Sequence, residues 1–196
     1  MGQIGHVLYN AIICINNIRY KLLYLLYMEN NNIVFNDIST TNTSLILLLD
    51  TIGFYGPLIV IICIVIALYK LPKYMWVFVL GIISNGLVNK YLKSIFLEDR
   101  PLHPIPFSKY EKYSGIEKYG MPSGHSAAIG FSIIYLLVVK PNSTWLPVCI
   151  AIGILTLYQR WKYRRHTVEQ IAIGFITGGL FGWIVYEVAT KCIVWL

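Results

Sequence analysis

The hydrophobic residues of this chain gather in long runs that short polar stretches separate. Two of these runs, 51–69 and 141–159, each contain 19 residues without an Asp, Glu, Lys or Arg. As an α-helix, such a run is about 28 Å long, close to the hydrocarbon thickness of a bilayer, about 30 Å. The pattern therefore predicts helices that cross a membrane.

Applied to the whole chain, this criterion predicts five membrane-spanning helices. They are expected at about 51–70, 74–92, 124–140, 144–160 and 167–189. The fifth carries Gly174, Gly178 and Gly182 at four-residue spacing, a stripe that lets another helix approach closely. The one long connection, 93–122, has a length that usually indicates a function in a compact domain.

The first 44 residues follow a different pattern. Apolar residues recur there near helical spacing, at Ile4, Leu8, Ile12, Ile15 and Ile18. Polar side chains lie between them, which favours an amphipathic helix in the membrane interface over a sixth span. Residues 29–44 are polar and are interpreted as a linker. We therefore expect an N-terminal amphipathic segment and linker at 1–44, and a membrane domain at 45–196.

Composition supports the membrane class. Hydrophobic residues make up 57% of the 196 residues and charged residues 13%, against about 25% charged in soluble domains. This excludes a disordered chain and a typical soluble enzyme. The net charge of +7 would suggest a nucleic-acid partner for a soluble protein, but here Lys and Arg flanking the spans account for most of it, so none is expected. The expected fold class is an all-α, polytopic membrane helix bundle with about five transmembrane helices plus an N-terminal interfacial helix.

Five spans determine which connections share a side of the membrane. The N-terminus, the 93–122 connection and the turn at 160–166 come to one face, because each crossing reverses the side. The charged and histidine-containing clusters of the chain lie in these connections, at 93–101, 121–125 and 160–166. We therefore expect the three clusters to meet at one membrane surface.

The first two clusters offer cations and an anion cradle. Lys93 and Arg100 are seven residues apart, about two helical turns, so both can face the same way. The second cluster, Pro-Ser-Gly-His at 122–125, directly precedes an apolar helix. Free backbone N–H groups at a helix start, beside a glycine such as Gly124, bind phosphate readily.

The third cluster adds Arg160 and His166 between two spans. Together with His125, it supplies two imidazoles that can transfer protons or attack phosphorus, while the cations bind a multiply charged oxyanion. Taken singly, each cluster could be a set of membrane-edge anchors. Their convergence on one side favours a phosphate site.

These motifs closely resemble the type 2 phosphatidic acid phosphatase superfamily of membrane lipid phosphatases. Its signature runs Lys-x6-Arg-Pro, then Pro-Ser-Gly-His, then Ser-Arg-x5-His-x3-Asp. The first two motifs match fully, at 93–101 and 122–125, and the third matches at Arg160 and His166. The three motifs occur in the family's order, which makes the resemblance specific.

Two residues depart from this signature. Gln159 stands where Ser is usual, and Gln170 stands where Asp is usual. The dolichyldiphosphatase subgroup resembles this chain in having His-Thr-x-x-Gln, here at 166–170. The resemblance covers about 50–190 and is greatest to this subgroup.

The resemblance implies a role for each motif residue. His166 is the nucleophile that forms a phosphohistidine, and His125 protonates the departing lipid phosphate. The phosphate oxygens are bound by Lys93, Arg100, Ser123, Gly124 and Arg160. No metal ion and no cofactor is expected, since the nearby carboxylates of Glu98 and Asp99 are not at ligand spacing with a histidine.

Two neighbouring residues could orient His166. Gln170 lies four residues after it and Glu169 three, so either can reach the ring from one face of a helix. Gln170 can accept one N–H bond and fix the tautomer, and we hypothesise that it does so. Glu169 could instead pair with Lys162 or Arg165 at the membrane edge.

The leading hypothesis is an integral-membrane phosphatase that hydrolyses the terminal phosphate of a polyprenyl (dolichyl) diphosphate. A phosphatase of phosphatidic acid or another lipid monophosphate uses the same chemistry and is the alternative. Charged residues within a membrane also mark lipid transporters that are not enzymes, the third hypothesis. The expected partners are the lipid bilayer and a lipid (di)phosphate substrate. The dolichyl subgroup implies the endoplasmic reticulum membrane, and the sequence predicts no oligomeric state.

Overall fold

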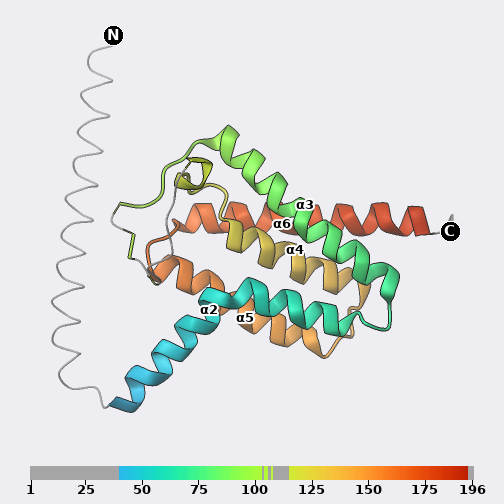
Figure 1. Cartoon of the computed structure of the whole chain (residues 1–196), viewed down its shortest axis with the longest axis horizontal. Coiled ribbons are helices and arrows are strands. Elements are labelled where there is room, and N and C mark those ends of the chain that lie inside the picture. The colour runs from blue at the N-terminus through green and yellow to red at the C-terminus, as the bar shows by residue number, and fades with distance from the viewer. Residues whose placement is uncertain (1–39, 103, 106, 108–114, 194–196) are drawn as a thin grey trace, which may run out of the picture. The chain divides into compact units, whose positions relative to one another are not determined.

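The computed structural model describes residues 40–102, 104, 105, 107 and 115–193. Within them, the chain folds into five α-helices and one short 3₁₀ helix (Figure 1). These are α2 (Thr40–Ala67), α3 (Pro72–Phe96), η1 (Gly115–Lys118), α4 (Gly124–Val139), α5 (Trp145–Lys162) and α6 (Val168–Ile193). The predicted all-α class is confirmed. The predicted interfacial helix lies outside the described residues, and the division at 1–44 and 45–196 stays a prediction.

The composition of the helices fits a membrane. Among the described helices, three are long and apolar enough to cross a bilayer: Ser44–Ala67, Pro72–Phe96 and Val168–Lys191. Large apolar side chains such as Leu80 (65% exposed) and Ile154 (62%) point outward. Such a surface requires an apolar medium to cover it. The protein is therefore a polytopic membrane helix bundle.

Helix α2 begins earlier than the span that the sequence predicts at residue 51. The predicted span begins only after Asp50, because an isolated membrane helix would exclude a charged residue. In the structure the Asp50 carboxylate is buried, and its Oδ2 accepts hydrogen bonds from Lys162 Nζ (2.6 Å) and Tyr163 Oη (2.8 Å). Because the charge is paired, the helix continues through it. The same contacts fasten α2 to the end of α5.

Helices α4 and α6 pack against each other more extensively than any other pair among α3, α4, α5 and α6 (Figure 1). A Cβ atom on Gly174 would lie 2.6 Å from Ser123 O, and one on Gly182 would lie 2.7 Å from Phe131 O. Only glycine permits such an approach of the two backbones. The predicted glycine stripe thus holds α4 close against α6 from Ser123 to Phe131.

The connections lie at two ends of the bundle. At one end, Lys140 Nζ donates to Ala67 O over 3.2 Å, which joins the two short turns. At the other end, Ile105 N donates to Tyr163 O over 3.0 Å, which joins the long connection to the turn after α5. The predicted convergence of the 93–122 connection and the 160–166 turn is confirmed.

Candidate active site

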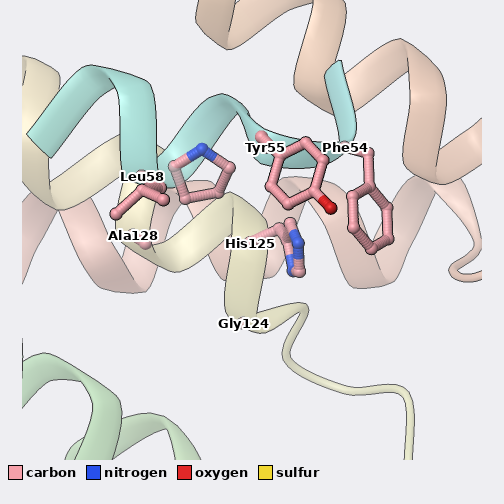
Figure 2. Close-up of a pocket in the computed structure, with 7 residues that line it drawn as sticks. Phe54, Tyr55, Leu58, Gly124, His125 and Ala128 are labelled. Atoms are coloured by element: carbon pink, nitrogen blue, oxygen red, sulfur yellow. The ribbon is translucent and has the colours of Figure 1, made fainter. Parts of the chain in front are cut away.

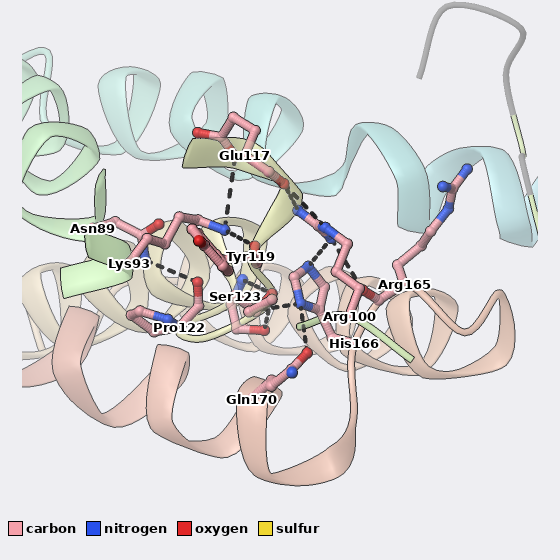
Figure 3. A network of polar contacts seen from close by, with 12 residues as sticks. Asn89, Lys93, Arg100, Glu117, Tyr119, Pro122, Ser123, Arg165, His166 and Gln170 are labelled. Atoms are coloured by element: carbon pink, nitrogen blue, oxygen red, sulfur yellow. Dashed lines mark hydrogen bonds and ion pairs between the residues drawn. The ribbon is translucent and has the colours of Figure 1, made fainter. Parts of the chain in front are cut away.

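The end of α3 directs polar side chains into the bundle. Asn85, Asn89 and Lys93 are spaced by four residues and are all buried on one face of the helix. Lys93 Nζ donates to Tyr119 O over 2.8 Å, and Asn89 Nδ2 donates to Pro122 O over 3.4 Å (Figure 3). The first cation of the site is therefore held against the segment that leads into α4.

Arg100 reaches across the site to the third motif. Its Nε and Nη2 donate to Glu117 O over 3.1 and 3.0 Å. Its Nη1 lies 3.0 Å from Arg165 O and 3.0 Å from His166 Nε2 (Figure 3). The guanidinium of the first motif thus contacts the imidazole of the third directly.

His166 lies in the turn between α5 and α6, and only 4% of it is exposed. A guanidinium can only donate, so Nε2 accepts from Arg100 and the ring proton is on Nδ1. Nδ1 lies 2.9 Å from Gly120 O and 3.3 Å from Gln170 Oε1. Burial and the positive charge of Arg100 hold the pKa of His166 well below its ordinary value of 6.5. The ring is therefore neutral, with its lone pair on Nε2.

Gln170 is the residue that lies against this ring. Its Oε1 faces His166 Nδ1, and its Nε2 donates to Glu98 Oε1 (2.7 Å) and Asp99 O (2.8 Å). The side chain is fully buried, whereas Glu169 is exposed. Gln170 thus connects the start of α6 to the segment that precedes Arg100.

Ser123 and Gly124 begin α4. Ser123 N donates to Gln170 O over 3.1 Å, and its fully buried Oγ accepts from Ser126 Oγ over 3.1 Å and caps the helix. The hydroxyl therefore already has a structural contact in this conformation. Gly124 is half-buried and lines a pocket together with His125.

His125 and Arg160 are connected through a residue that the sequence did not indicate, Phe54 of α2. The Phe54 ring lies 6.4 Å from the His125 ring between centroids. The guanidinium carbon of Arg160 lies 5.1 Å from the Phe54 ring centre, within cation–π range. The charges of Lys93, Arg100 and Arg160 all act on both imidazoles. The two histidines and the three motif cations thus share one electrostatic environment.

Gln159, one of the two departures from the family signature, contacts its neighbour. Its Oε1 accepts from Arg160 Nε over 2.7 Å, and both residues are buried. Gln159 Nε2 has no hydrogen-bond partner within the described part of the chain. Gln159 therefore orients the guanidinium of Arg160, one of the motif cations.

Sequence reasoning missed Glu117 and Asp50. Glu117 lies in η1 and contacts Arg100 through its carbonyl and Lys93 through its carboxylate. No motif or periodicity marks a residue of this kind. Asp50 did carry a signal, since a single carboxylate within an apolar helix usually has a specific partner.

Comparison with known proteins agrees with this geometry. Residues 74–193, more than half of the chain, match the PAP2 superfamily. The chain belongs to the PAP2 superfamily. The resemblance drawn from the three motifs is therefore confirmed.

Two curated relatives are named as phosphatases. A dolichyldiphosphatase from Saccharomyces cerevisiae is 31% identical over 113 residues, which cover 52% of this chain and 46% of the relative. The lipid phosphate phosphatase epsilon 1, chloroplastic, from Arabidopsis thaliana is 28% identical over 127 residues, which cover 60% of this chain and 38% of the relative. The matches thus span less than half the length of both relatives.

A solved PAP2 structure has the same fold. The transmembrane PAP2 type phosphatidylglycerolphosphate phosphatase from Bacillus subtilis superposes with a TM-score of 0.54. The superposition covers 79% of this chain and 80% of that chain, at 18% sequence identity. The likeness extends the family assignment to the arrangement of the helices.

Proposed function

We propose that this chain is an integral-membrane phosphatase that removes the terminal phosphate of a polyprenyl diphosphate. The observation that carries the proposal is the contact between Arg100 and Nε2 of His166. It brings a phosphate-binding cation onto the lone pair of a neutral, buried imidazole. The dolichyldiphosphatase relative supports the choice of a polyprenyl substrate.

The proposed reaction has two steps. Nε2 of His166 attacks the terminal phosphorus, the P–O bond to the leaving lipid phosphate breaks, and a phosphohistidine forms. His125 donates a proton to the leaving oxygen. Water then attacks the phosphohistidine while His125 takes its proton, the P–N bond breaks, and inorganic phosphate is released.

The cations stabilise the phosphoryl group in both steps. Charge remains on its equatorial oxygens in the transition state, so fixed donors supply most of the acceleration. Lys93, Arg100 and Arg160 serve as these donors, together with the Gly124 N–H and the Ser123 hydroxyl. Arg100 turns from Nε2 to a phosphate oxygen when the substrate binds, which frees the lone pair for attack.

An apolar pocket beside His125 supports a lipid substrate. It has a volume of about 280 Å³ and lies between α2 and α4 (Figure 2). Its lining consists of Phe54, Tyr55, Pro57, Leu58, Gly124, His125 and Ala128. The general acid must lie beside the leaving oxygen, so the first part of the departing lipid occupies this pocket.

The proposed location is the endoplasmic reticulum membrane of a eukaryotic cell, because the chain resembles dolichyldiphosphatases.

The proposed mechanism uses no metal ion or cofactor. Among the described residues, no three His, Cys, Asp or Glu side chains lie together as metal ligands would. The three cations take over the neutralisation of charge that a divalent ion supplies in other phosphoryl transfers. Independence from metal stays a prediction.

A lipid monophosphate is the second candidate substrate. The specific observation in its favour is the match to the lipid phosphate phosphatase from Arabidopsis. The same pocket and cations would hold the single phosphate of such a lipid. The two candidates therefore differ in the leaving group only.

Phosphate release from purified full-length protein in lipid nanodiscs, with chelator present, tests the proposal. Wild type is expected to hydrolyse polyprenyl diphosphate faster than phosphatidic acid, with inhibition by vanadate. His166→Ala is expected to lose activity by about 10³-fold or more, and the exposed Glu169→Ala serves as the matched control. Faster hydrolysis of phosphatidic acid would favour the second candidate. No hydrolysis by a folded wild type would favour a lipid transporter.

A further inference from the structure

Glu117 contacts both cations of the first motif with different atoms. Its carboxylate Oε2 lies 3.7 Å from Lys93 Nζ, and its carbonyl oxygen accepts both the Nε and Nη2 hydrogen bonds of Arg100. The side chain of Glu117 comes from η1, outside the membrane helices (Figure 3). An internal carboxylate therefore lies beside a cation that the proposed reaction assigns to phosphate.

The two partners of this ion pair differ in their freedom to move. The side chain of Lys93 is 2% exposed and is also fixed by its 2.8 Å hydrogen bond to Tyr119 O. The side chain of Glu117 is 43% exposed, and its distance of 3.7 Å from Nζ is longer than that of a direct hydrogen bond. An arriving anion can therefore displace the carboxylate into water while the ammonium stays in place.

We infer that Glu117 competes with the substrate's phosphate for Lys93 and helps to expel inorganic phosphate after hydrolysis. The inference rests on the proposed function, and it adds a residue outside the three family motifs to the site. After the second step, inorganic phosphate faces the three motif cations and binds strongly unless another anion replaces it. The carboxylate belongs to the same residue as the carbonyl that accepts from Arg100, so it is already positioned to return.

The carboxylate can be changed without disturbing the contact to Arg100. Glu117→Gln keeps the backbone carbonyl and the side-chain shape and removes only the negative charge. Glu169→Gln is the matched control, because it also removes one carboxylate from the same end of the bundle. Glu169 is exposed, and its side chain hydrogen-bonds with the neighbouring Thr167.

The experiment measures inhibition of polyprenyl diphosphate hydrolysis by inorganic phosphate and by vanadate, in full-length protein in nanodiscs. Exposed ion pairs are usually weak, so Glu117→Gln is expected to lower both inhibition constants and KM by about two- to five-fold. Damage to the fold would weaken anion binding, so a gain in affinity separates competition from a structural role. Glu117→Asp, whose carboxylate is one methylene shorter, is expected to fall between wild type and Glu117→Gln.

Each outcome bears on one of two claims. Active wild type with tighter phosphate binding in Glu117→Gln, and unchanged binding in Glu169→Gln, supports the inference. Active wild type with unchanged or weaker binding in both Glu117 variants overturns it and leaves the proposed function intact. An inactive, folded wild type that binds neither anion overturns the proposed function and the inference together.

Discussion

Arg100 Nη1 donates to His166 Nε2 across 3.0 Å and across 66 positions of the sequence. The same nitrogen lies 3.0 Å from Arg165 O, so the guanidinium is fixed at the base of the α5–α6 turn. This contact has two consequences for the proposed reaction. Together with burial, it keeps the imidazole neutral, and it places the cation where an oxygen of the attacked phosphate must arrive.

Arg100→Lys is expected to impair catalysis more than binding. Lysine keeps the charge but cannot contact Glu117 O, Arg165 O and His166 Nε2 from one planar group. Loss of a single preorganised donor to a transition-state oxyanion lowers kcat by about 10²-fold. Steady-state kinetics on polyprenyl diphosphate measures the split between kcat and KM. A rise in KM alone would contradict the proposed role of Arg100.

Gln170→Ala is expected to lower kcat about 10- to 100-fold, because a misplaced reacting group has an effect of this size. The variant removes Oε1 from His166 Nδ1 and also frees the Glu98 carboxylate. Glu169→Ala is expected to behave like wild type, since that side chain is exposed. The measurement is turnover of both variants side by side. If only Glu169→Ala loses its turnover, the assignment of Gln170 is wrong.

The lowered pKa of His166 predicts that its imidazole is neutral in the empty enzyme at pH 6.5. The causes are burial first and the charge of Arg100 second. NMR of histidine-labelled protein can follow this ring, with His166→Asn to assign its signal. The signal should show the neutral form, protonated on Nδ1, and should change only well below pH 6.5. A midpoint at or above 6.5 would contradict the electrostatic account.

The lowered pKa of His166 also affects the stability of the fold. Below pH 6.5 the unfolded chain binds a proton at His166 that the folded chain does not bind. The free energy of unfolding therefore falls as pH falls below 6.5, and this contribution vanishes above it. Thermal unfolding in detergent should show a smaller loss between pH 6.5 and 5 in a folded His166→Asn variant than in wild type. An equal loss in the two proteins would assign the effect to other groups.

Gly174→Ala is expected to destabilise the protein by about 1–3 kcal/mol, the usual range for overpacking. A Cβ atom there would lie 2.6 Å from Ser123 O and 3.0 Å from Ser123 N. The start of α4 would have to move away from α6, and His125 would move with it. Thermal unfolding and turnover measure both effects. Gly86→Ala is the matched control, because a Cβ atom at Gly86 meets nothing within 4 Å.

The sequence predicted the described α-helices and the end of the bundle at which the motif residues meet. Bilayer thickness limits the length of an apolar run, so the runs indicated the spans. Each span reverses the direction of the chain, so the count of spans indicated that His125 and His166 lie at the same end. Both inferences use local patterns and simple geometry, and neither needs knowledge of side-chain contacts.

Contacts between distant, non-periodic residues could not be predicted in this way. The uncharged run predicts a span from residue 51, and no local pattern indicates that Asp50 pairs with Lys162 and Tyr163, which lie more than 100 residues away. Glu117 lies in a polar connection whose path no periodicity describes. The sequence marks Gln159 only as a departure from a motif, and nothing in the pattern indicates its hydrogen bond with Arg160.

Trapping of a phosphoenzyme tests the central claim most directly. Full-length protein is mixed with polyprenyl diphosphate labelled on the terminal phosphate and quenched within one turnover. Wild type should carry an acid-labile, base-stable label on His166, and His166→Ala should carry none. Hydrolysis by wild type without any labelled histidine, or full turnover by His166→Ala, would contradict the account.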